Sequence, residues 1–375
     1  MERKIKILVT SVGSLVGQNI QDVLEYPAFK RRDIVELIGT NSIASSPNNF
    51  RCDRCYLVSN TNTEDFKNEL IEILKKEQPD LILSGRDEDS ETVALLLHNN
   101  SELPGKSPYG KPITLKYALD KWETWVFCQK HNLPFADTFC IGKSGNIDEL
   151  SLFVEEHSYP LIAKPIQGFA SKGVFFVRNW EDVIEISKLE NYLFQEYLGE
   201  ASKLDNYFKQ IDGPTPLFAH APNIFHHSCH TIVAPDGSFD EIFISRNEHD
   251  SGVTVGFKRV FNSELEELTS QFAHAIHKEG GYGPFTAQFR EDKNGIWKVQ
   301  EMNMRTNGNT FPRFMMGQDD LGLIVQGVLP KVNFPVYKAE KGTHNNVIGK
   351  VLTSYAMNPE EIDNLKEKRE WGFKK

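Results

Sequence analysis

The sequence of 375 residues has neither a long apolar run nor an excess of basic residues. Its hydrophobic stretches fall well short of the roughly eighteen residues that a membrane-spanning helix needs. Residues 1–5 lead directly into a strand-like segment, so we expect no secretion signal and a cytoplasmic location. The net charge of −10 argues against a general binder of nucleic acids, although a nucleotide needs only a few local cations. We therefore expect neither a membrane nor a nucleic acid as partner.

Cysteines are few, and their spacing gives little support for a metal or redox site. The chain has five cysteines, an odd number that fits a reducing compartment. Cys52 and Cys55 form a CxxC pair with no second pair, so two small residues in a loop or strand are favoured over a zinc or redox role. Cys128, Cys140 and Cys229 are predicted to be buried packing residues.

The first hundred residues alternate buried-strand runs with helical patterns, and the length of the chain predicts two or three domains. Strands are predicted at 5–9, 35–39, 55–58 and 79–83, and helices at 18–24 and 64–77. This β-α-β rhythm predicts a parallel sheet with helices on both faces. Ligands of such sheets bind where the strands end, which indicates the loops at 11–14 and 85–89.

The loop after the first strand has an incomplete dinucleotide-binding pattern. Gly13 and Gly17 have the spacing G-x-x-x-G, not G-x-G-x-x-G. Thr40 and Asn41 stand where an acidic residue would hold a ribose. An NAD(P)-binding oxidoreductase that uses Gly13 and Gly17 is therefore only an alternative from a different functional class.

A stretch with three prolines and two glycines at 104–112 predicts a domain boundary. Beyond it the pattern predicts a small α+β unit with mostly antiparallel strands, and then a larger unit. Residues 199–224 are polar and interrupted by prolines, so we interpret them as an inserted loop. The residues after Pro330 are expected to form a C-terminal extension, 331–375.

A hairpin near the end of the larger unit contains a set of polar residues that packing does not require. The dipeptide Asn294–Gly295 between two aromatic-rich runs predicts a hairpin with a two-residue turn. In that register Gln288 faces Glu301, and Asn303 and Arg305 share their face by alternation. Amide and carboxylate oxygens suit Mg²⁺ that is held jointly with nucleotide phosphates. The alternative is an amphipathic hairpin whose polar face points to water.

A loop of glycine and small residues follows a strand that ends in a lysine. Lys164 is that lysine, and the loop runs from Gly168 to Gly173 with Ser171 and Lys172 within it. Backbone N–H groups in such a loop can approach phosphate oxygens closely, and a lysine neutralises their charge. The alternative is a plain hairpin connection with a solvated Lys172.

Taken together, these motifs resemble the ATP-grasp superfamily, and within it the branch that is similar to the large subunit of carbamoyl-phosphate synthase. The similarity runs from about residue 5 to about residue 330. It includes Asp120-Lys121 at the start of a helix, the strand Ala163-Lys164-Pro165 with its loop, the segment Gln195 to Leu198, and the hairpin. The resemblance implies a Rossmann-like pre-ATP-grasp domain (1–113), followed by a two-lobed ATP-grasp fold with a small lid subdomain (114–192) and a large catalytic subdomain (193–330).

The resemblance also implies ATP and Mg²⁺ as cofactors, with two ions expected and Mn²⁺ as an alternative metal. The residues implied to bind ATP are Lys121, Lys164, Gly168, Ser171, Lys172 and Gly173 at the phosphates, and Gln195, Glu196, Tyr197 and Leu198 at the adenine. The implied metal ligands are Gln288, Glu301 and Asn303. Arg305 would steady the reacting phosphate, and Arg246 would clamp a carboxylate or the transferred phosphoryl group, with a plain surface arginine as the alternative.

Two features depart from the family pattern. An acidic residue for the ribose is expected just after residue 198, where the insert lies, so Glu200 and Asp205 are the candidates. The segment 226–230 contains three histidines and a cysteine, but alternation along a strand brings only His226 and His230 together on one side. Two histidines fall short of a four-ligand zinc site, so substrate contact or packing is favoured.

The function implied is that of an ADP-forming carboxylate–amine ligase acting on small-molecule carboxylate and amine substrates. An amino-acid or peptide-type ligase is preferred, because the chain has one such module and no evident glutaminase segment. The alternatives are activation of bicarbonate as in carbamoyl-phosphate synthase, the NAD(P)-dependent oxidoreductase, and an ATP-binding protein without turnover. The sequence leaves the oligomeric state open, with a homodimer as one possibility, since dimers are common in the superfamily.

Overall fold

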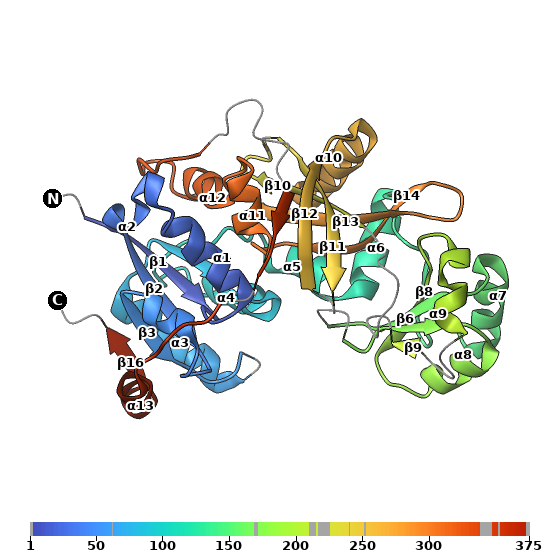
Figure 1. Cartoon of the computed structure of the whole chain (residues 1–375), viewed down its shortest axis with the longest axis horizontal. Coiled ribbons are helices and arrows are strands. Elements are labelled where there is room, and N and C mark those ends of the chain that lie inside the picture. The colour runs from blue at the N-terminus through green and yellow to red at the C-terminus, as the bar shows by residue number, and fades with distance from the viewer. Residues whose placement is uncertain are drawn as a thin grey trace.

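The computed structural model describes residues 3–61, 63–168, 172–209, 215–216, 226–239, 241–250, 253–337, 347–351 and 353–372. Figure 1 shows the N-terminal domain and a small unit at opposite ends of the molecule, with the largest sheet between them. Within the described part, no helix has both the length and the apolar character that crossing a membrane would require.

The N-terminal domain is built on a parallel sheet, as the sequence predicts. Its central strand β1 (Ile5–Thr10) lies between β2 (Val35–Asn41) and β4 (Leu81–Ser84), and β3 (Arg54–Leu57) extends the sheet beyond β2. The strands read as continuous apolar runs because helices cover both faces. These helices are α1 (Leu15–Leu24), η1 (Pro27–Phe29), α2 (Arg31–Ile34), η2 (Pro47–Arg51), α3 (Glu64–Glu77) and α4 (Asp87–Asn99).

The small unit, which we call the lid, contains an antiparallel five-stranded sheet in the order β5-β8-β6-β7-β9. Its strands are β5 (Thr138–Phe139), β6 (Leu161–Pro165), β7 (Phe175–Val177), β8 (Tyr192–Glu196) and β9 (Thr215–Pro216), and its helices are α7 (Ile147–His157), α8 (Trp180–Ser187), η3 (Ala201–Leu204) and α9 (Asp205–Phe208). Because β8 lies between β5 and β6, the lid continues past residue 192, and the boundary predicted there is wrong. Leu204 and Tyr207 also pack against Phe176 of β7, so part of the predicted insert belongs to the lid.

The central sheet, which we call the catalytic sheet, has six strands in the order β14-β13-β10-β11-β12-β15. One face packs on a helix through Phe272, which stacks on Phe285 and meets Phe289 edge-on. The other face carries the polar residues described below. The strands are β10 (His226–Val233), β11 (Phe243–Asp250), β12 (Val253–Val260), β13 (Gly283–Glu291), β14 (Trp297–Asn303) and β15 (Val347–Gly349), and the helices are α5 (Pro112–Leu119), α6 (Lys121–His131), α10 (Ser263–Lys278), α11 (Thr310–Met315) and α12 (Asp320–Val328).

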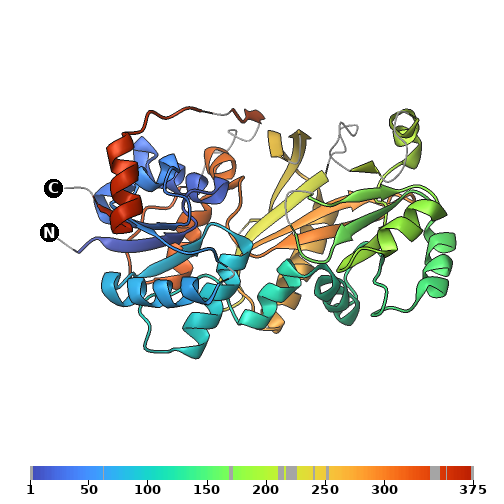
Figure 2. The same cartoon turned by 90° about the horizontal axis from the view of Figure 1, so that it is seen from below.

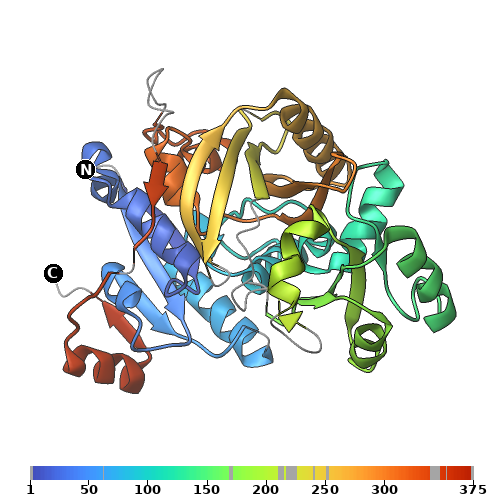
Figure 3. The same cartoon turned by 45° about the vertical axis from the view of Figure 1, so that its right-hand side comes forward.

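The C-terminal segment, residues 347–372, adds a strand to two different sheets, and we call it the C-terminal strap. Its first strand, β15, pairs with β12 at the edge of the catalytic sheet (Figure 3). The chain then crosses to the N-terminal domain (Figure 2), where α13 (Pro359–Lys368) is followed by β16 (Glu370–Gly372). β16 pairs antiparallel with β3, which closes the edge of the parallel sheet.

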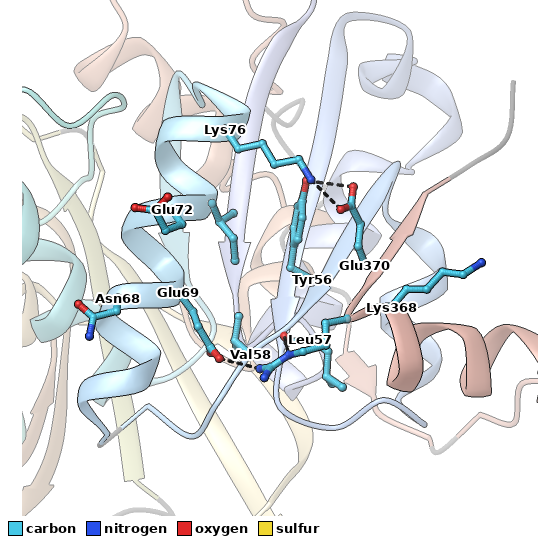
Figure 4. Close-up of a pocket in the computed structure, with 11 residues that line it drawn as sticks. Tyr56, Leu57, Val58, Asn68, Glu69, Glu72, Lys76, Lys368 and Glu370 are labelled. Atoms are coloured by element: carbon cyan, nitrogen blue, oxygen red, sulfur yellow. Dashed lines mark hydrogen bonds and ion pairs between the residues drawn. The ribbon is translucent and has the colours of Figure 1, made fainter.

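Ion pairs hold the end of the strap on the N-terminal domain. Lys76 of α3 lies 2.6 Å from Glu370, and Arg369 lies 2.7 Å from Glu69. Figure 4 shows Lys76 and Glu370 pointing toward one another across a pocket of about 500 Å³ between α3 and the strap. None of the site residues predicted from the sequence lines this pocket, so it is not the candidate active site.

Candidate active site

The hairpin predicted at β13 and β14 is present, but its turn differs from the prediction. The N–H of Asp292 donates to the carbonyl of Ile296 at 2.8 Å, so the loop contains three residues, 293–295, not two. Gly295 has a φ of +80°, a conformation that favours glycine. The Asp292 carboxylate accepts hydrogen bonds from the N–H groups of Asn294 and Ile296 at 2.8 and 3.0 Å. The predicted two-residue turn is therefore wrong.

A β-bulge restores the predicted register farther along the hairpin. Phe289 pairs with Val299, whereas Gln288 pairs with Glu301, so Gln300 is an extra residue on β14. The longer loop shifts the register by one position and the bulge shifts it back. The predicted opposition of Gln288 and Glu301 is confirmed.

Side chains alternate strictly after the bulge. Met302 and Met304 are 1% and 2% exposed and belong to the core. Glu301, Asn303 and Arg305 are partly exposed, as residues of the opposite face. The polar face predicted for the hairpin is therefore present.

Arg305 connects this face to the N-terminal domain. Its Nη2 forms an ion pair with Asp87, and its Nη1 donates to the carbonyl of Thr306 at 3.0 Å. Burial lowers its pKa, but Asp87 and then Glu301 raise it more, so that the guanidinium stays charged. Asp87 begins α4 and belongs to the loop 85–89, which the sequence predicts as a ligand-binding loop. That loop therefore reaches the polar face of the hairpin.

Lys164 reaches across from the lid to the catalytic sheet. Its Nζ donates at 3.0 Å to the carbonyl of Gln300, the bulged residue. Burial, and next the charge of Lys121, lowers the pKa of Lys164 to about 7, although Glu301 acts in the opposite direction. Two lysines and the carboxylate of the hairpin therefore interact at one place between the two sheets.

Lys121 and Arg290 add further positive charge to this place. Asp120 caps α6 by accepting hydrogen bonds from the N–H groups of its first turn, and the next residue, Lys121, donates from Nζ to the carbonyl of Gly168 at 3.2 Å. Arg290 lies two residues from Gln288 on β13 and so shares its face. Burial lowers the pKa of Arg290 to about 10. The sequence reasoning missed Arg290, although this alternation was enough to find it.

The glycine-rich loop between β6 and β7 is described only in part. Gly168 lies at its start and Lys172 and Gly173 at its end, while Ser171 lies outside the described residues. Lys172 is exposed. The loop begins four residues after Lys164, and the carbonyl of Gly168 at its start accepts a hydrogen bond from Lys121.

The side chains of Gln195 and Glu196 both form hydrogen bonds with neighbouring residues of the lid. Gln195 donates to the hydroxyl of Thr138 at 3.0 Å, and Glu196 accepts a hydrogen bond from the N–H of Asp137 at 2.8 Å. The backbone of these two residues is left to contact an adenine. β8 ends at Glu196, so Tyr197 and Leu198 follow the strand outside the lid sheet.

An ion-pair network lies beside this segment. Ligand atoms of Asp137, His157 and Glu196 lie within 4.8 Å of one another, a spacing that suits a metal ion. However, Lys298 Nζ lies 2.5 Å from Glu196 and 3.2 Å from Asp137. The ammonium group supplies the positive charge that the carboxylates need, so we interpret the cluster as structural.

Arg246 lies on the opposite face of the catalytic sheet from Gln288. It pairs with His227, which in turn pairs with Phe289. Gln288 instead pairs with Ser228. Residues directly opposite each other share a face, so Arg246 shares the face of Phe289, which packs on α10. Arg246 therefore points away from the predicted reacting centre, on the opposite face of the sheet. Its predicted position at that centre is wrong.

Within the described residues, no histidine of β10 belongs to a cluster of side chains that could hold a metal ion. His226 and His230 share a face, as predicted, and both are buried. His230 belongs to a closed ring of polar contacts. Its Nε2 lies 3.2 Å from Asp320, and its Nδ1 lies 2.7 Å from the hydroxyl of Thr286. Asn307 donates to that hydroxyl at 3.2 Å, and Arg313 closes the ring by donating to Asn307 at 3.1 Å and to Asp320 at 3.0 Å. Because Thr286 pairs with Asn303, the ring supports the end of the polar face.

The cysteines behave as the sequence predicts. All five are free and buried, including Cys52 and Cys55 of the CxxC pair. Burial raises the pKa of the thiols of Cys128, Cys140 and Cys229, which are therefore unreactive packing residues.

No family model matches the chain. Beta-citrylglutamate synthase B of Mus musculus is 27% identical over 99 residues, which are 25% of this chain and 26% of that protein. The match thus spans about a quarter of the length of the curated relatives. Among solved structures, N5-carboxyaminoimidazole synthetase from Staphylococcus aureus complexed with ADP has a TM-score of 0.65 at 13% identity, covering 88% of this chain and 78% of that chain. L-amino acid ligase from Bacillus licheniformis has a TM-score of 0.60 at 13% identity, covering 88% and 75%. These likenesses confirm the predicted ATP-grasp fold.

Proposed function

We propose that this chain, which has the ATP-grasp fold, is an ADP-forming ligase that joins a carboxylate to an amine. Two sets of residues meet at the contact between Lys164 and Gln300, and this observation carries the proposal. Cations suited to phosphates come from the lid side and from β13, namely Lys121, Lys164 and Arg290. Oxygen donors suited to a divalent cation come from the facing strands, namely Gln288, Glu301 and Asn303.

The proposed reaction has two steps. A substrate carboxylate oxygen attacks the γ-phosphorus of ATP, the bond to the β-phosphate oxygen breaks, and ADP leaves. The amine then attacks the carbonyl carbon of the acylphosphate, the carbon–oxygen bond to phosphate breaks, and the amine loses a proton. No side chain becomes covalently modified, so catalysis consists of positioning and of offsetting charge.

Each group of residues has a defined role in this proposal. Lys121, Lys164 and Arg290 bind the phosphates, and Arg305 steadies the transferred phosphoryl group from its place beside Asp87. Gln288, Glu301 and Asn303 are carbonyl and carboxylate donors that fit Mg²⁺, which offsets phosphate charge when bound. Two ions are proposed, with Mn²⁺ as the alternative metal.

The lid would complete the site. We propose that the backbone of Tyr197 and Leu198 contacts the adenine, and that the loop from Gly168 to Gly173, with Ser171 and Lys172, covers the phosphates. Exclusion of water would protect the acylphosphate from hydrolysis. The residue that binds the ribose is Glu200 or Asp205 in this proposal.

An amino-acid or peptide-type ligation is the substrate class we favour. It is supported by the names of two similar proteins, the L-amino acid ligase and beta-citrylglutamate synthase B. Small-molecule carboxylate and amine substrates, a cytoplasmic location and a homodimer stay predictions. The specific relationship to carbamoyl-phosphate synthase also stays a prediction.

The test is a screen for ADP release with Mg·ATP and paired amino acids, dicarboxylates and amines, with bicarbonate as a separate arm. We expect ADP release that requires both a carboxylate and an amine. Release with bicarbonate alone would favour the carbamoyl-phosphate type of reaction. Binding of NAD(P) without binding of Mg·ATP would overturn the proposal.

A further inference from the structure

The C-terminal strap places a lysine beside the loop that follows the polar face of β14. Lys350 comes directly after β15, and its N–H donates to the carbonyl of Val255 at 3.0 Å. Its Nζ donates to the carbonyl of Gly308 and, at 2.5 Å, to the side-chain oxygen of Asn309. The strap therefore reaches the same end of the catalytic sheet as Arg305.

Among the residues that the structure describes, no carboxylate balances the charge of Lys350. Arg305 is paired with Asp87, and Arg313 with Asp320. No ion pair links Lys350 to any described residue, and both of its hydrogen-bond acceptors are neutral oxygens. Burial, and then the nearby Arg313, lowers the pKa of Lys350 to about 8. An unbalanced ammonium in a partly buried position is costly, and a bound anion would stabilise it.

The loop that Lys350 contacts also lies against the N-terminal domain. Gly308 approaches α1 closely, because a Cβ there would lie 2.8 Å from Cδ2 of Leu15, which would then have to move. The side-chain oxygen of Asn19 accepts a hydrogen bond from the N–H of Phe311 at 2.9 Å. Ser14 caps α1, whose first turn contains no acidic residue, so the positive end of this helix dipole lies near the same loop. The loop 11–14, in which the sequence predicts a ligand, directly precedes α1.

We propose that Lys350 binds a carboxylate of the substrate, and that the substrate is a dicarboxylate or an acidic amino acid. The inference rests on the proposed ligase function, which it deepens. One carboxylate of the substrate reacts near Glu301 and Arg305, and the second, unreactive carboxylate binds between Lys350, Asn309 and the start of α1. The strap thus supplies a specificity determinant that the ATP-grasp units alone do not contain.

The test compares binding of succinate and of L-glutamate to the full-length protein by calorimetry, with and without Mg²⁺ and a non-hydrolysable ATP analogue. We expect at least one of the two to bind the wild-type protein. Lys350→Met should weaken that binding about 10- to 100-fold, the range expected for a lost hydrogen bond to a charged group. Lys350→Arg, which keeps the charge, should restore most of the affinity. Lys366→Met, at an exposed lysine of the same strap, is the matched control.

Activity measurements separate this inference from the proposed function. With an active substrate pair, Lys350→Met should raise the KM for the carboxylate about 10- to 100-fold and leave the KM for ATP unchanged. Equal carboxylate affinity in the wild type and in Lys350→Met would overturn the inference, and so would turnover limited to monocarboxylates. Failure of the wild type to bind Mg·ATP would instead overturn the ligase proposal, while the succinate and glutamate titrations without nucleotide still test Lys350.

Discussion

At the scale of single residues, Lys164 is notable because its charge depends on whether an anion lies beside it. With a pKa of about 7, the side chain is mostly neutral at pH 8 in the protein without nucleotide. Phosphate oxygens favour the charged form and raise the pKa. Binding of a nucleotide above pH 7 should therefore draw a proton from solution.

This predicts proton uptake approaching one proton per nucleotide at pH 8. The measurement is calorimetric titration of Mg·ATP analogue in buffers that differ in ionisation enthalpy. Lys164→Arg should bind nucleotide without this uptake, because arginine is charged both before and after binding. Equal proton uptake in the two proteins would refute the assignment of Lys164 to the phosphates.

The second residue-scale prediction concerns Glu301. Glu301→Ala should reduce ADP release by at least about 100-fold, because the variant lacks the carboxylate proposed to hold the Mg²⁺ that offsets the phosphate charge. The thermal unfolding temperature should change little, since Glu301 lies on the partly exposed face. Glu291→Ala, an exposed carboxylate on the same hairpin, is the control and should keep full activity. A Glu301→Ala protein with normal ADP release would remove the metal assignment.

At the scale of elements, the ring around Asp320 joins β10, β13, α11 and α12. Burial acts to raise the pKa of Asp320, but Arg313 and His230 together hold it well below its usual range. The carboxylate therefore stays ionised and balances the buried guanidinium of Arg313. Removal of one partner from such a pair leaves an uncompensated charge in the interior.

Asp320→Ala should consequently destabilise the protein by about 3–5 kcal/mol. Equilibrium unfolding in urea measures this loss. The control, Asp363→Ala, removes an exposed carboxylate that pairs with the exposed Lys366 on α13, and it should have little effect. Equal unfolding midpoints for the two variants would show that the ring does not stabilise the fold.

The hairpin shows how far the sequence could lead at this scale. The Asn-Gly signal located the hairpin, and alternation correctly placed Gln288 opposite Glu301. The three-residue loop and the bulge at Gln300 were not predicted, because the tertiary contact of Lys164 with the bulged carbonyl comes from another domain. Arg246 was misplaced because the resemblance indicated the segment that contains it but not the face of the sheet from which its side chain projects.

The short C-terminal strands mark the limit of sequence-based prediction. β15 and β16 have three residues each, too few to show a period of two. Each is a strand only because it pairs with an edge that another part of the chain provides. The long periodic segment 64–77 was by contrast predicted with the bounds of α3.

At the scale of the whole molecule, the strap connects the catalytic sheet to the N-terminal domain. Leu365 is the fully buried residue of α13, so it anchors the end of the strap. Leu365→Ala should weaken the docking of α13 and β16 by about 2–5 kcal/mol. Hydrogen exchange should then become faster in residues 359–372 while β1 and β13 keep their protection.

Lys366→Ala, at an exposed position of the same helix, should leave exchange in residues 359–372 unchanged. Unchanged exchange in Leu365→Ala would mean that α13 is held by its ion pairs rather than by apolar packing. If Lys350 binds the substrate, the Leu365→Ala protein should also have a raised KM for the carboxylate.

The pairing of β16 with β3 has a consequence for biosynthesis. A ribosome makes β3 more than three hundred residues before β16, so the nascent N-terminal domain folds with one sheet edge open. An open edge can pair with strands of other chains, which makes aggregation most probable during this interval. Chaperone assistance should therefore matter most before translation ends. Coding sequences truncated before β16 should yield insoluble product.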